Sequence, residues 1–301
     1  MSPDERDRRQ GVLAALAAYT SWGLFPLYFK SLRAPPQEVL VHRIVWSAVF
    51  LLLIHVVQRR WQWLLDALRS PRVLLGSLLS ACLLSANWFI WIWAVANGRV
   101  IEGSLGYFIT PLVQVLLGVV LLREALRPAQ WLSLAFAALG VLWLTIEVGH
   151  LPWVALGLAA SFGSYAVLRK TAKLGSLQGL ALETWLLCPL ALVYLLWIVQ
   201  QGQSSFLQDG LGQRVALLCA GPLTAIPLVL FASGARRIPL SLVGVLQYIS
   251  PTFQLLLGVI IWHEPFPPRK ALGYALIWLA LLLYSGESLW MWRRTAHARS
   301  L

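Results

Sequence analysis

The stretch Ile101–Glu124, IEGSLGYFITPLVQVLLGVVLLRE, is partly repeated later in the chain. From Pro111 it reads PLVQVLLGVVLLRE, and from Pro251 the chain reads PTFQLLLGVIIWHE, with half of these positions identical. The same offset of 140 residues carries Lys30 onto Lys170. An offset held from the first apolar segment to the last indicates two copies of one unit, joined head to tail.

The composition of the chain predicts an integral membrane protein. Apolar residues make up 59% of the 301 residues and charged residues 12%, and the mean hydropathy is +0.72. These values exclude a soluble domain of ordinary composition. Apolar runs of about 18 to 25 residues, long enough to cross a bilayer core of roughly 30 Å, follow one another without the alternation typical of barrel strands. The ten predicted membrane helices span residues 11–29, 37–58, 72–96, 100–122, 128–146, 151–169, 177–200, 212–235, 239–261 and 268–291.

The basic residues predict the orientation of these helices. Of the 24 Lys and Arg residues, 17 fall in the amino-terminal segment and every second connection after it, and six fall in the other connections. Because cytoplasmic connections are enriched in Lys and Arg, both termini are expected in the cytoplasm. With five helices in each copy, the second copy is inverted relative to the first. The predicted all-α membrane fold has a tail at 1–10, five-helix repeats at 11–149 and 151–291, and a tail at 292–301.

Neither the net charge nor the cysteines indicate a further partner. The formal charge of +12 is scattered over short connections, which is typical of a topology signal with affinity for anionic lipid and not of nucleic-acid binding. Cys82, Cys188 and Cys219 lie in apolar runs, without the spacing of a metal site or a disulfide framework. The phosphate-binding loop of an ATP-driven pump does not occur, and no cofactor is expected. The sequence leaves the oligomeric state open.

Charged groups inside the runs are candidates for function, because charge at membrane depth is costly. Arg43 and Glu183 occupy equivalent positions in the two repeats, so we expect them to face each other across the repeat interface. One interpretation is a substrate-binding or gating pair in a central cavity, and the other is a buried ion pair that fixes helix packing. His42, beside Arg43, is the one histidine deep inside a run and a further candidate for gating or coupling.

Aromatic residues indicate a pocket for an apolar group. Asn87, Trp88 and Trp91 share one face of the third run, and Trp22 and Trp46 add aromatic surface. Such a surface suits an aromatic or amphipathic ligand. The alternative is that these tryptophans serve helix packing.

The fourth and ninth runs carry a matched face of small and polar residues. Pro111 and Pro251 lie in the middle of these runs, where each is expected to kink its helix beside a cavity or neighbouring helices. The alternative role for the small residues is close helix crossing. Glu102, one turn into the fourth run, is either a titrating coupling residue or a carboxylate stabilised by the helix dipole. The matched residues are Ser104, Tyr107, Pro111, Gln114 and Gly118, and Gly244, Gln247, Pro251, Gln254 and Gly258.

A set of residues spread over both repeats carries a family resemblance: Tyr19, Trp22-Gly23, Tyr28-Phe29-Lys30, Glu38, His42-Arg43, Trp46-Ser47, Asn87-Trp88, Glu102, Ser104 to Ile109, Pro111-Leu112, Glu183-Thr184, Gln247-Tyr248-Ile249 and Pro251. With these residues the chain resembles the drug/metabolite transporter superfamily with its EamA-type repeats, and more narrowly the RarD group of permeases. The resemblance implies a permease of the bacterial cytoplasmic membrane, in a group loosely tied by name to chloramphenicol sensitivity. It places Tyr248 beside Gln247 among the expected binding residues. Thr110 and Ser250 stand where the family pattern leads us to expect Asn and Gly.

Together these patterns predict a secondary transporter whose two repeats rock around a site at the membrane midplane. Arg43 is expected to recognise an anionic group, and Trp88 and Trp91 to hold the apolar part of a small metabolite, amino-acid-like compound or drug. Energy would come from a proton gradient, coupled through Glu183 or Glu102, or from the substrate's own gradient.

Two other classes of function compete with transport. An enzyme is not expected, because the segment Gly103-Ser104-Leu105-Gly106 lacks the G-x-S-x-G spacing of a serine nucleophile. A membrane sensor or scaffold that transports nothing is the other alternative.

Overall fold

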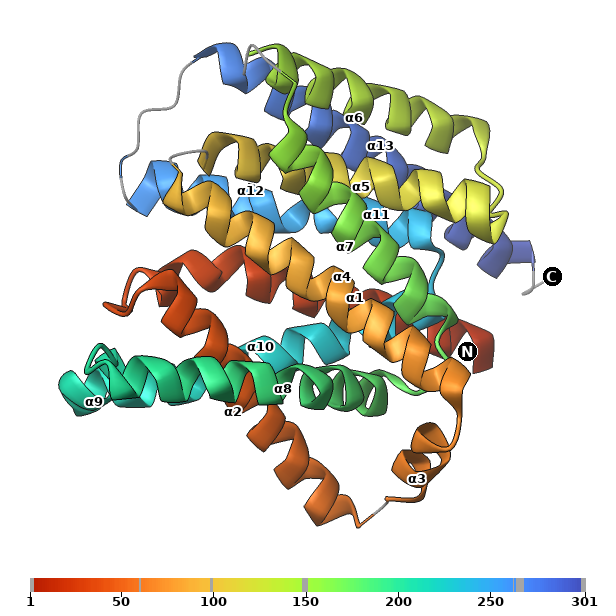
Figure 1. The fold of residues 1–301 in the computed structure, drawn as a ribbon. Helices are drawn as coiled ribbons and strands as arrows, with labels where there is room; N and C mark the ends of the chain where they lie inside the picture. The colour runs from red at the N-terminus through yellow and green to blue at the C-terminus, as the bar shows by residue number, and fades with distance from the viewer. Residues whose placement is uncertain are drawn as a thin grey trace.

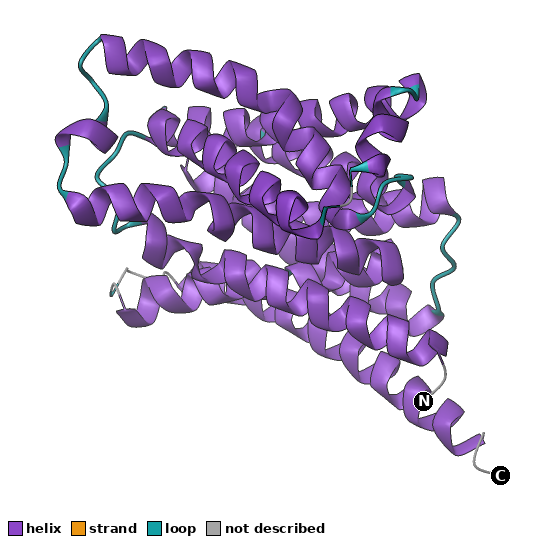
Figure 2. Cartoon of the chain, turned by 90° about the horizontal axis from the view of Figure 1, so that it is seen from below, coloured by secondary structure: helices purple, strands orange, loops and turns teal. Residues whose placement is uncertain are grey.

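The structure, a computed structural model, is a bundle of helices (Figures 1 and 2). It describes residues 3–59, 61–97, 100–147, 151–261, 263 and 268–298, and for residues 3–4, 92, 95–96, 100–102, 104, 258 and 288–298 it describes the backbone only. Every regular element among the described residues is helical, as the composition predicts.

The helices fall into two groups by length. The long helices are α1 (Pro3–Phe29), α2 (Pro36–Gln58), α4 (Pro71–Ala96), α5 (Val100–Leu122), α6 (Pro128–Ile146), α7 (Trp153–Thr171), α8 (Ser176–Gln200), α10 (Leu211–Arg237) and α13 (Pro268–Ala298). The short ones are α3 (Gln62–Leu68), α9 (Ser205–Gln208), α11 (Leu240–Gln247), α12 (Ile249–Leu256) and the π-helix η1 (Leu257–Ile261).

Eight helical stretches of the described chain are long and apolar enough to cross a membrane, and the protein is a multi-pass membrane protein. Helices α7 and α13 correspond to two further predicted spans but are not among the eight. Arg169 and Lys170 in the last turn of α7 lower its mean hydropathy. The count of ten spans therefore stays a prediction. The eight stretches are Glu5–Phe29, Pro36–Gln58, Pro71–Trp91, Leu105–Leu122, Pro128–Ile146, Ser176–Gln200, Leu211–Arg237 and Leu240–Ile261.

The first and last helices extend beyond the apolar runs. Helix α1 begins at Pro3, inside the segment expected as an amino-terminal tail, and α13 continues to Ala298, inside the expected carboxyl-terminal tail. A helix satisfies its own backbone hydrogen bonds, so it can continue past the hydrocarbon region, whereas hydropathy reports only the apolar part.

Pro251 breaks the helix that the ninth run was expected to form. Proline has no N–H to donate to the carbonyl four residues earlier, that of Gln247, and its ring clashes with that carbonyl. The helix accordingly stops at Gln247, resumes at Ile249 and ends as a π-helix. Helix α5 continues through Pro111 without a break, so the kink expected there stays a prediction.

The largest helix-to-helix contacts join the first half of the chain to the second. Helix α1 packs on α10, α2 on α10, and α5 on α7. Under the offset of 140 residues these contacts correspond to α7 on α4, α8 on α4, and the α11–α12 segment on α1, all of which are also formed. The pairs α2–α8, α5–α11 and α6–α13 join equivalent helices. The contact pattern is therefore symmetric under exchange of the halves.

A cluster of buried aromatic rings lies where the two halves meet. Trp22 and Phe162 are equivalent residues, and their ring centroids lie 5.8 Å apart. Contact between equivalents places the pseudo-two-fold axis between these two rings. The rings of Tyr19, Tyr165 and Phe231 pack beside them, and all three side chains are fully buried. The start of α1 and the end of α13 lie at one end of the bundle, and the α8–α9 connection lies at the other (Figure 1).

Candidate functional site

A cavity of about 200 Å³ lies between helices of both halves. On α1 its lining begins at Tyr19 and reaches Phe29, the last residue of that helix, and on α5 it takes Tyr107 and Thr110 from the first half of the helix. The cavity therefore lies toward the end of the bundle away from the termini (Figure 1). Its lining residues are Tyr19, Trp22, Phe25, Pro26, Phe29, Arg43, Leu84, Asn87, Trp88, Trp91, Tyr107, Thr110, Leu158, Phe162, Leu228, Gln247, Ser250, Pro251 and Gln254.

Arg43 is the positively charged group of this cavity. Its Nε donates a hydrogen bond of 2.9 Å to the hydroxyl of Thr224 on α10. The guanidinium carbon lies 4.9 Å from the ring centroid of Trp88 and 5.6 Å from that of Phe29. Aromatic faces stabilise a cation without neutralising it. No carboxylate of the described residues forms an ion pair with Arg43, so its charge is available to an anionic group in the cavity.

Amide side chains add directional polar groups to the cavity wall. The Asn87 amide nitrogen donates to the carbonyl of Leu158 at 3.0 Å and to the hydroxyl of Ser161 at 3.1 Å, so it ties α4 to α7. The Gln254 amide nitrogen donates to the carbonyl of Trp22 at 3.3 Å. The amide oxygen of Gln247 is buried and accepts no hydrogen bond from the described residues. A buried acceptor of this kind is costly unless a ligand or water pairs with it.

The structure brings together six of the eight residues expected to bind substrate. Arg43, Asn87, Trp88, Trp91, Tyr107 and Gln247 all line the cavity, and so does Pro251. The ring of Tyr107 lies 5.2 Å from that of Trp91. Their role in substrate binding stays a prediction.

Trp46 and Tyr248 do not line the cavity. The indole N–H of Trp46 donates to Nδ1 of His42 at 3.0 Å, and its ring faces Phe206. Tyr248 is buried in a separate core, where its ring packs against Phe108. One residue along a helix is a turn of about 100°, so Tyr248 points away from the face that holds Gln247.

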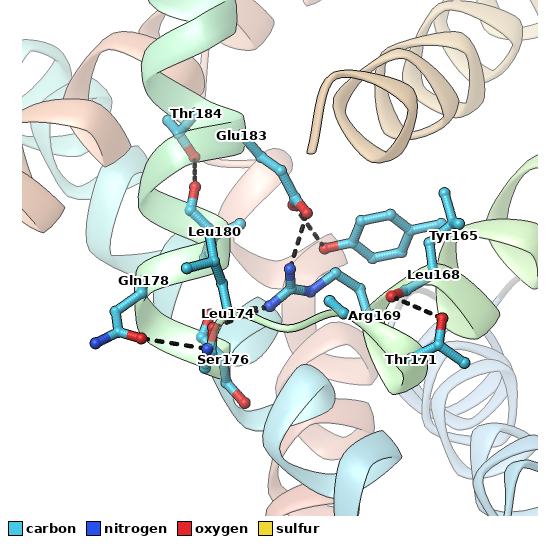
Figure 3. A network of polar contacts seen from close by, with 12 residues as sticks. Tyr165, Leu168, Arg169, Thr171, Leu174, Ser176, Gln178, Leu180, Glu183 and Thr184 are labelled. Atoms are coloured by element: carbon cyan, nitrogen blue, oxygen red, sulfur yellow. Dashed lines mark hydrogen bonds and ion pairs between the residues drawn. The ribbon is translucent and has the colours of Figure 1, made fainter. Parts of the chain in front are cut away.

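The expected pairing of Arg43 with Glu183 is wrong. Glu183 forms a buried ion pair with Arg169 instead, with 3.0 Å between the carboxylate oxygen and the guanidinium nitrogen, and accepts a hydrogen bond of 3.4 Å from Tyr165 (Figure 3). Glu183 does not line the large cavity. Helices α2 and α8 do pack against each other, as expected, but these two side chains find other partners.

The two-fold arrangement explains why equivalent charges do not meet. In the inverted arrangement that the sequence predicts, a residue on one side of the midplane has its equivalent at the same depth on the other side. Arg43 lies over Phe29, fourteen positions earlier, and Glu183 pairs with Arg169, also fourteen positions earlier. Each residue therefore contacts the equivalent partner within its own half, at opposite ends of the bundle.

His42, another expected coupling residue, also lies outside the cavity lining. Nε2 of His42 is 3.7 Å from a carboxylate oxygen of Glu38, and that carboxylate accepts hydrogen bonds from the hydroxyl of Ser204 and the backbone N–H groups of Ser205 and Phe206. The side chain of Glu102 falls outside the described residues. No group of three or more His, Cys, Asp or Glu side chains in the described part of the chain is placed to hold a metal ion.

The sequence profile of the EamA-like transporter family matches the chain twice, at residues 9–146 and again at 152–286. The chain belongs to the EamA-like transporter family. This EamA-like protein is therefore a membrane transporter and not an enzyme.

Relatives place the EamA-like protein in the RarD group. It is similar to "Protein RarD" of Streptomyces exfoliatus, with 44% identity over 97% of this chain and 93% of that one. It is also similar to an "Uncharacterized transporter" of Pseudomonas aeruginosa, with 42% identity over 95% of each chain. A solved structure titled "Crystal structure of protein" has a similar fold, with a TM-score of 0.67, 20% identity, and coverage of 91% of this chain and 96% of that one.

Sequence reasoning missed two polar residues of this EamA-like transporter. Arg169 was counted only as a basic residue at the end of a run, yet it is 1% exposed and paired with Glu183. In the sequence, Glu124 is only the last residue of the repeated segment Ile101–Glu124. Its carboxylate accepts hydrogen bonds from the backbone N–H groups of Leu240 and Ser241, at the start of α11. The signal that could have marked Glu124 is its place within the repeated segment.

Proposed function

We propose that this protein is a secondary transporter of a small metabolite, amino-acid-like compound or drug, working by alternating access around the central cavity. The proposed topology has ten membrane helices in two inverted five-helix repeats, with both termini in the cytoplasm. The proposed location is the inner membrane of a bacterium. Support comes from the symmetric helix contacts, from the two family matches at residues 9–146 and 152–286, and from termini that lie at one end of the bundle. A substrate site near the pseudo-two-fold axis is typical of such repeats.

The helix contacts suggest which parts move. Helices α1, α2, α10 and the α11–α12 segment are joined to one another, and their equivalents α7, α8, α4 and α5 are joined in the same way. Each of these two bundles contains helices from both repeats, and the cavity lies between them. We therefore propose motion of these mixed bundles, because rocking of one repeat against the other would separate the largest helix contacts.

The single observation that carries the substrate class is Arg43 held between aromatic rings without an ion-pair partner among the described residues. An anionic group would face the guanidinium, and an apolar body would lie along Trp88 and Trp91. Exclusion of water from such a site strengthens the attraction between the two charges. Amino-acid-like carboxylates and anionic aromatic metabolites fit this arrangement best.

The energy source is a proton gradient or the substrate's own gradient. The candidate coupling residues are His42 with its neighbour Glu38, Glu183 with its partner Arg169, and Glu102. Uptake measured with and without an imposed pH gradient separates the two sources.

The proposal is tested first by thermal stability of the purified protein in detergent. The panel contains amino acids, amines, aromatic carboxylates and chloramphenicol. A ligand at one hundred times its dissociation constant raises the free energy of unfolding by about 2.7 kcal/mol. Carboxylates are expected to stabilise the wild type, and amines are not.

The matched variants are Arg43→Ala and Arg214→Ala, which remove one arginine from the cavity and one exposed arginine from the first turn of α10, near the same end. Loss of a charged hydrogen bond is expected to weaken binding and uptake about 10- to 100-fold in Arg43→Ala. Arg214→Ala is expected to match the wild type. Wild-type affinity in Arg43→Ala would refute the assigned site, and absence of saturable uptake into vesicles that hold only this protein would refute transport.

A further inference from the structure

The cavity occupies one half of a symmetric arrangement. The axis between Trp22 and Phe162 relates the cavity residues far from it to equivalents nearer the end that carries the termini, whereas pairs close to the axis, such as Tyr107 and Gln247, both line the cavity. Gln254, Phe25, Phe29, Arg43 and Trp91 line the cavity. Their equivalents, at an offset of 140 residues, are Gln114, Tyr165, Arg169, Glu183 and Phe231.

These equivalents are closed off in the present structure. Gln114, Tyr165 and Phe231 are fully buried, and Arg169 and Glu183 are each 1% exposed. The Tyr165 and Phe231 rings stack on each other, with Tyr19 against Phe231. This aromatic layer separates the cavity from the Arg169–Glu183 pair.

The polarity of this closed region is not explained by packing. Both amide atoms of Gln114 and the Nε of Arg169 are buried, and the Gln114 amide lies beside the buried hydroxyl of Tyr19. None of these atoms makes a hydrogen bond of normal geometry within the described part of the chain. Gln254, the equivalent of Gln114, donates a hydrogen bond to the carbonyl of Trp22. A buried polar group without a partner costs free energy, which a path that opens to water and substrate in another state would explain.

A second pocket already reaches these residues from the end of the bundle that carries the termini. It has a volume of about 150 Å³ and lies between α4, α7 and the start of α8. Glu183 and Arg169 form part of its wall, together with the hydroxyl-bearing residues Ser77 and Ser80.

A latch at the same end, formed by Glu124 and Lys170, holds three elements together. The Glu124 carboxylate accepts hydrogen bonds from the N–H groups of Leu240 at 2.5 Å and Ser241 at 2.9 Å, and lies 3.7 Å from the Lys170 ammonium. That ammonium also donates to the carbonyls of Ala235 at 3.1 Å and Ile238 at 2.5 Å. The latch therefore joins the ends of α5 and α7 to the corner between α10 and α11.

We propose that Gln114, Tyr165, Arg169 and Glu183 line the inward-facing half of the substrate path, which opens when the Glu124–Lys170 latch releases. The anionic group of the substrate then passes from Arg43 to Arg169, which exchanges its ion pair with Glu183 for one with the substrate. This inference rests on the alternating-access function proposed above and names the second half of its site.

Accessibility of equivalent cysteines tests the inference without a known substrate. Gln114→Cys and Gln254→Cys are compared on a background with Cys82, Cys188 and Cys219 replaced by Ser. A membrane-impermeant maleimide is applied to right-side-out and to inside-out vesicles. Gln254→Cys is expected to react from outside only, and Gln114→Cys from the cytoplasmic face only. The equivalent pair Trp91→Cys and Phe231→Cys repeats the comparison in case one variant does not fold.

Variants of the latch residues are then expected to change the labelling rates of Gln114→Cys and Gln254→Cys in opposite directions. Lys170→Met, or Glu124→Gln as the second variant, is expected to raise labelling of Gln114→Cys about tenfold and to lower that of Gln254→Cys, because it biases the conformational equilibrium. Arg237→Met removes a cation from the same end, where its partner Asp7 is exposed, and is expected to change neither rate.

Different outcomes would refute the inward-facing path and the proposed transport. Labelling of both equivalents from the same face, or no labelling of Gln114→Cys and Phe231→Cys even in the latch variants, would overturn the inward-facing path. Alternating labelling in a protein that takes up none of the panel compounds would leave the path intact and contradict the proposed transport of those compounds.

Discussion

Arg43 and Glu183 show two ways in which a charge is accommodated at membrane depth. Arg43 is stabilised by the rings of Trp88 and Phe29 and by one hydroxyl, and it borders a cavity. Glu183 is stabilised by a full ion pair with Arg169. Because aromatic rings do not neutralise a cation, Arg43 is the residue that we propose to bind an incoming anion. Glu183 is neutralised as long as Arg169 remains beside it.

The Arg169–Glu183 pair leads to a prediction about stability. Arg169→Ala leaves the carboxylate of Glu183 buried without a cation, and we expect the free energy of unfolding to fall by about 3–5 kcal/mol. Removing both charges in Arg169→Met/Glu183→Leu avoids the unpaired ion and is expected to recover most of that loss. Denaturant-induced unfolding in detergent measures both variants. A single variant as stable as the wild type would show that the pair contributes little.

At the scale of elements, close helix crossings depend on glycine where two backbones meet. A Cβ at Gly221 on α10 would overlap the backbone carbonyl of Trp46 on α2. The same two helices are joined by the hydrogen bond from Ser47 to the carbonyl of Gly221 and by that from Arg43 to Thr224. Any side chain at residue 221 therefore moves the helix that carries Arg43.

Gly221→Ala is expected to lower the free energy of unfolding by about 1–3 kcal/mol or more, because the added methyl group overpacks the crossing. Gly76→Ala on α4 is the matched control, since no atom lies within 4 Å of its added Cβ. Alanine is also the better helix former, so this variant is expected to be neutral or up to about 1 kcal/mol more stable. Thermal unfolding of the two variants measures this difference. Equal stability of Gly221→Ala and Gly76→Ala would contradict the close crossing of α2 and α10.

At the scale of the whole molecule, the positions of the short helices α3 and α9 support the proposed inversion of the repeats. They follow equivalent long helices, α2 and α8, and lie at opposite ends of the bundle (Figure 1). The connections that follow α7 and α8 are likewise at opposite ends. The proposed topology places the first in the cytoplasm and the second outside.

Labelling of two exposed connections tests this topology. Lys173→Cys lies between α7 and α8, and Gln203→Cys lies between α8 and α9. With native cysteines replaced, an impermeant maleimide is expected to reach Gln203→Cys in intact cells lacking an outer-membrane barrier, and Lys173→Cys only in inside-out vesicles. Labelling of both from one face would refute the inverted arrangement.

Much of the fold and part of the site follow from local properties of the sequence. Hydropathy locates the helices because burial in lipid selects apolar residues wherever a segment spans it. The repeated segment predicts which helices are equivalent. Helical periodicity places Asn87, Trp88 and Trp91 on one face, and these residues do line the cavity.

The chemistry of individual residues also sets where a helix breaks. Pro251 interrupts its helix at Tyr248 because proline removes one donor and adds one clash. Pro111, in contrast, does not interrupt helix α5. The outcome at a proline therefore depends on the neighbouring helices, which the segment itself does not contain.

The sequence by itself determined the membrane class, the helical elements, the repeat and six of the residues on the cavity wall. The tertiary structure alone decided the partners of the charges: Arg43 with Thr224, Glu183 with Arg169, and Glu124 with the start of α11. Periodicity tells which face of a helix a residue occupies, but not which helix covers that face or at what depth. In the proposed arrangement of inverted halves, equivalent residues away from the axis lie at opposite depths, which explains why the charges that match in sequence do not meet in space.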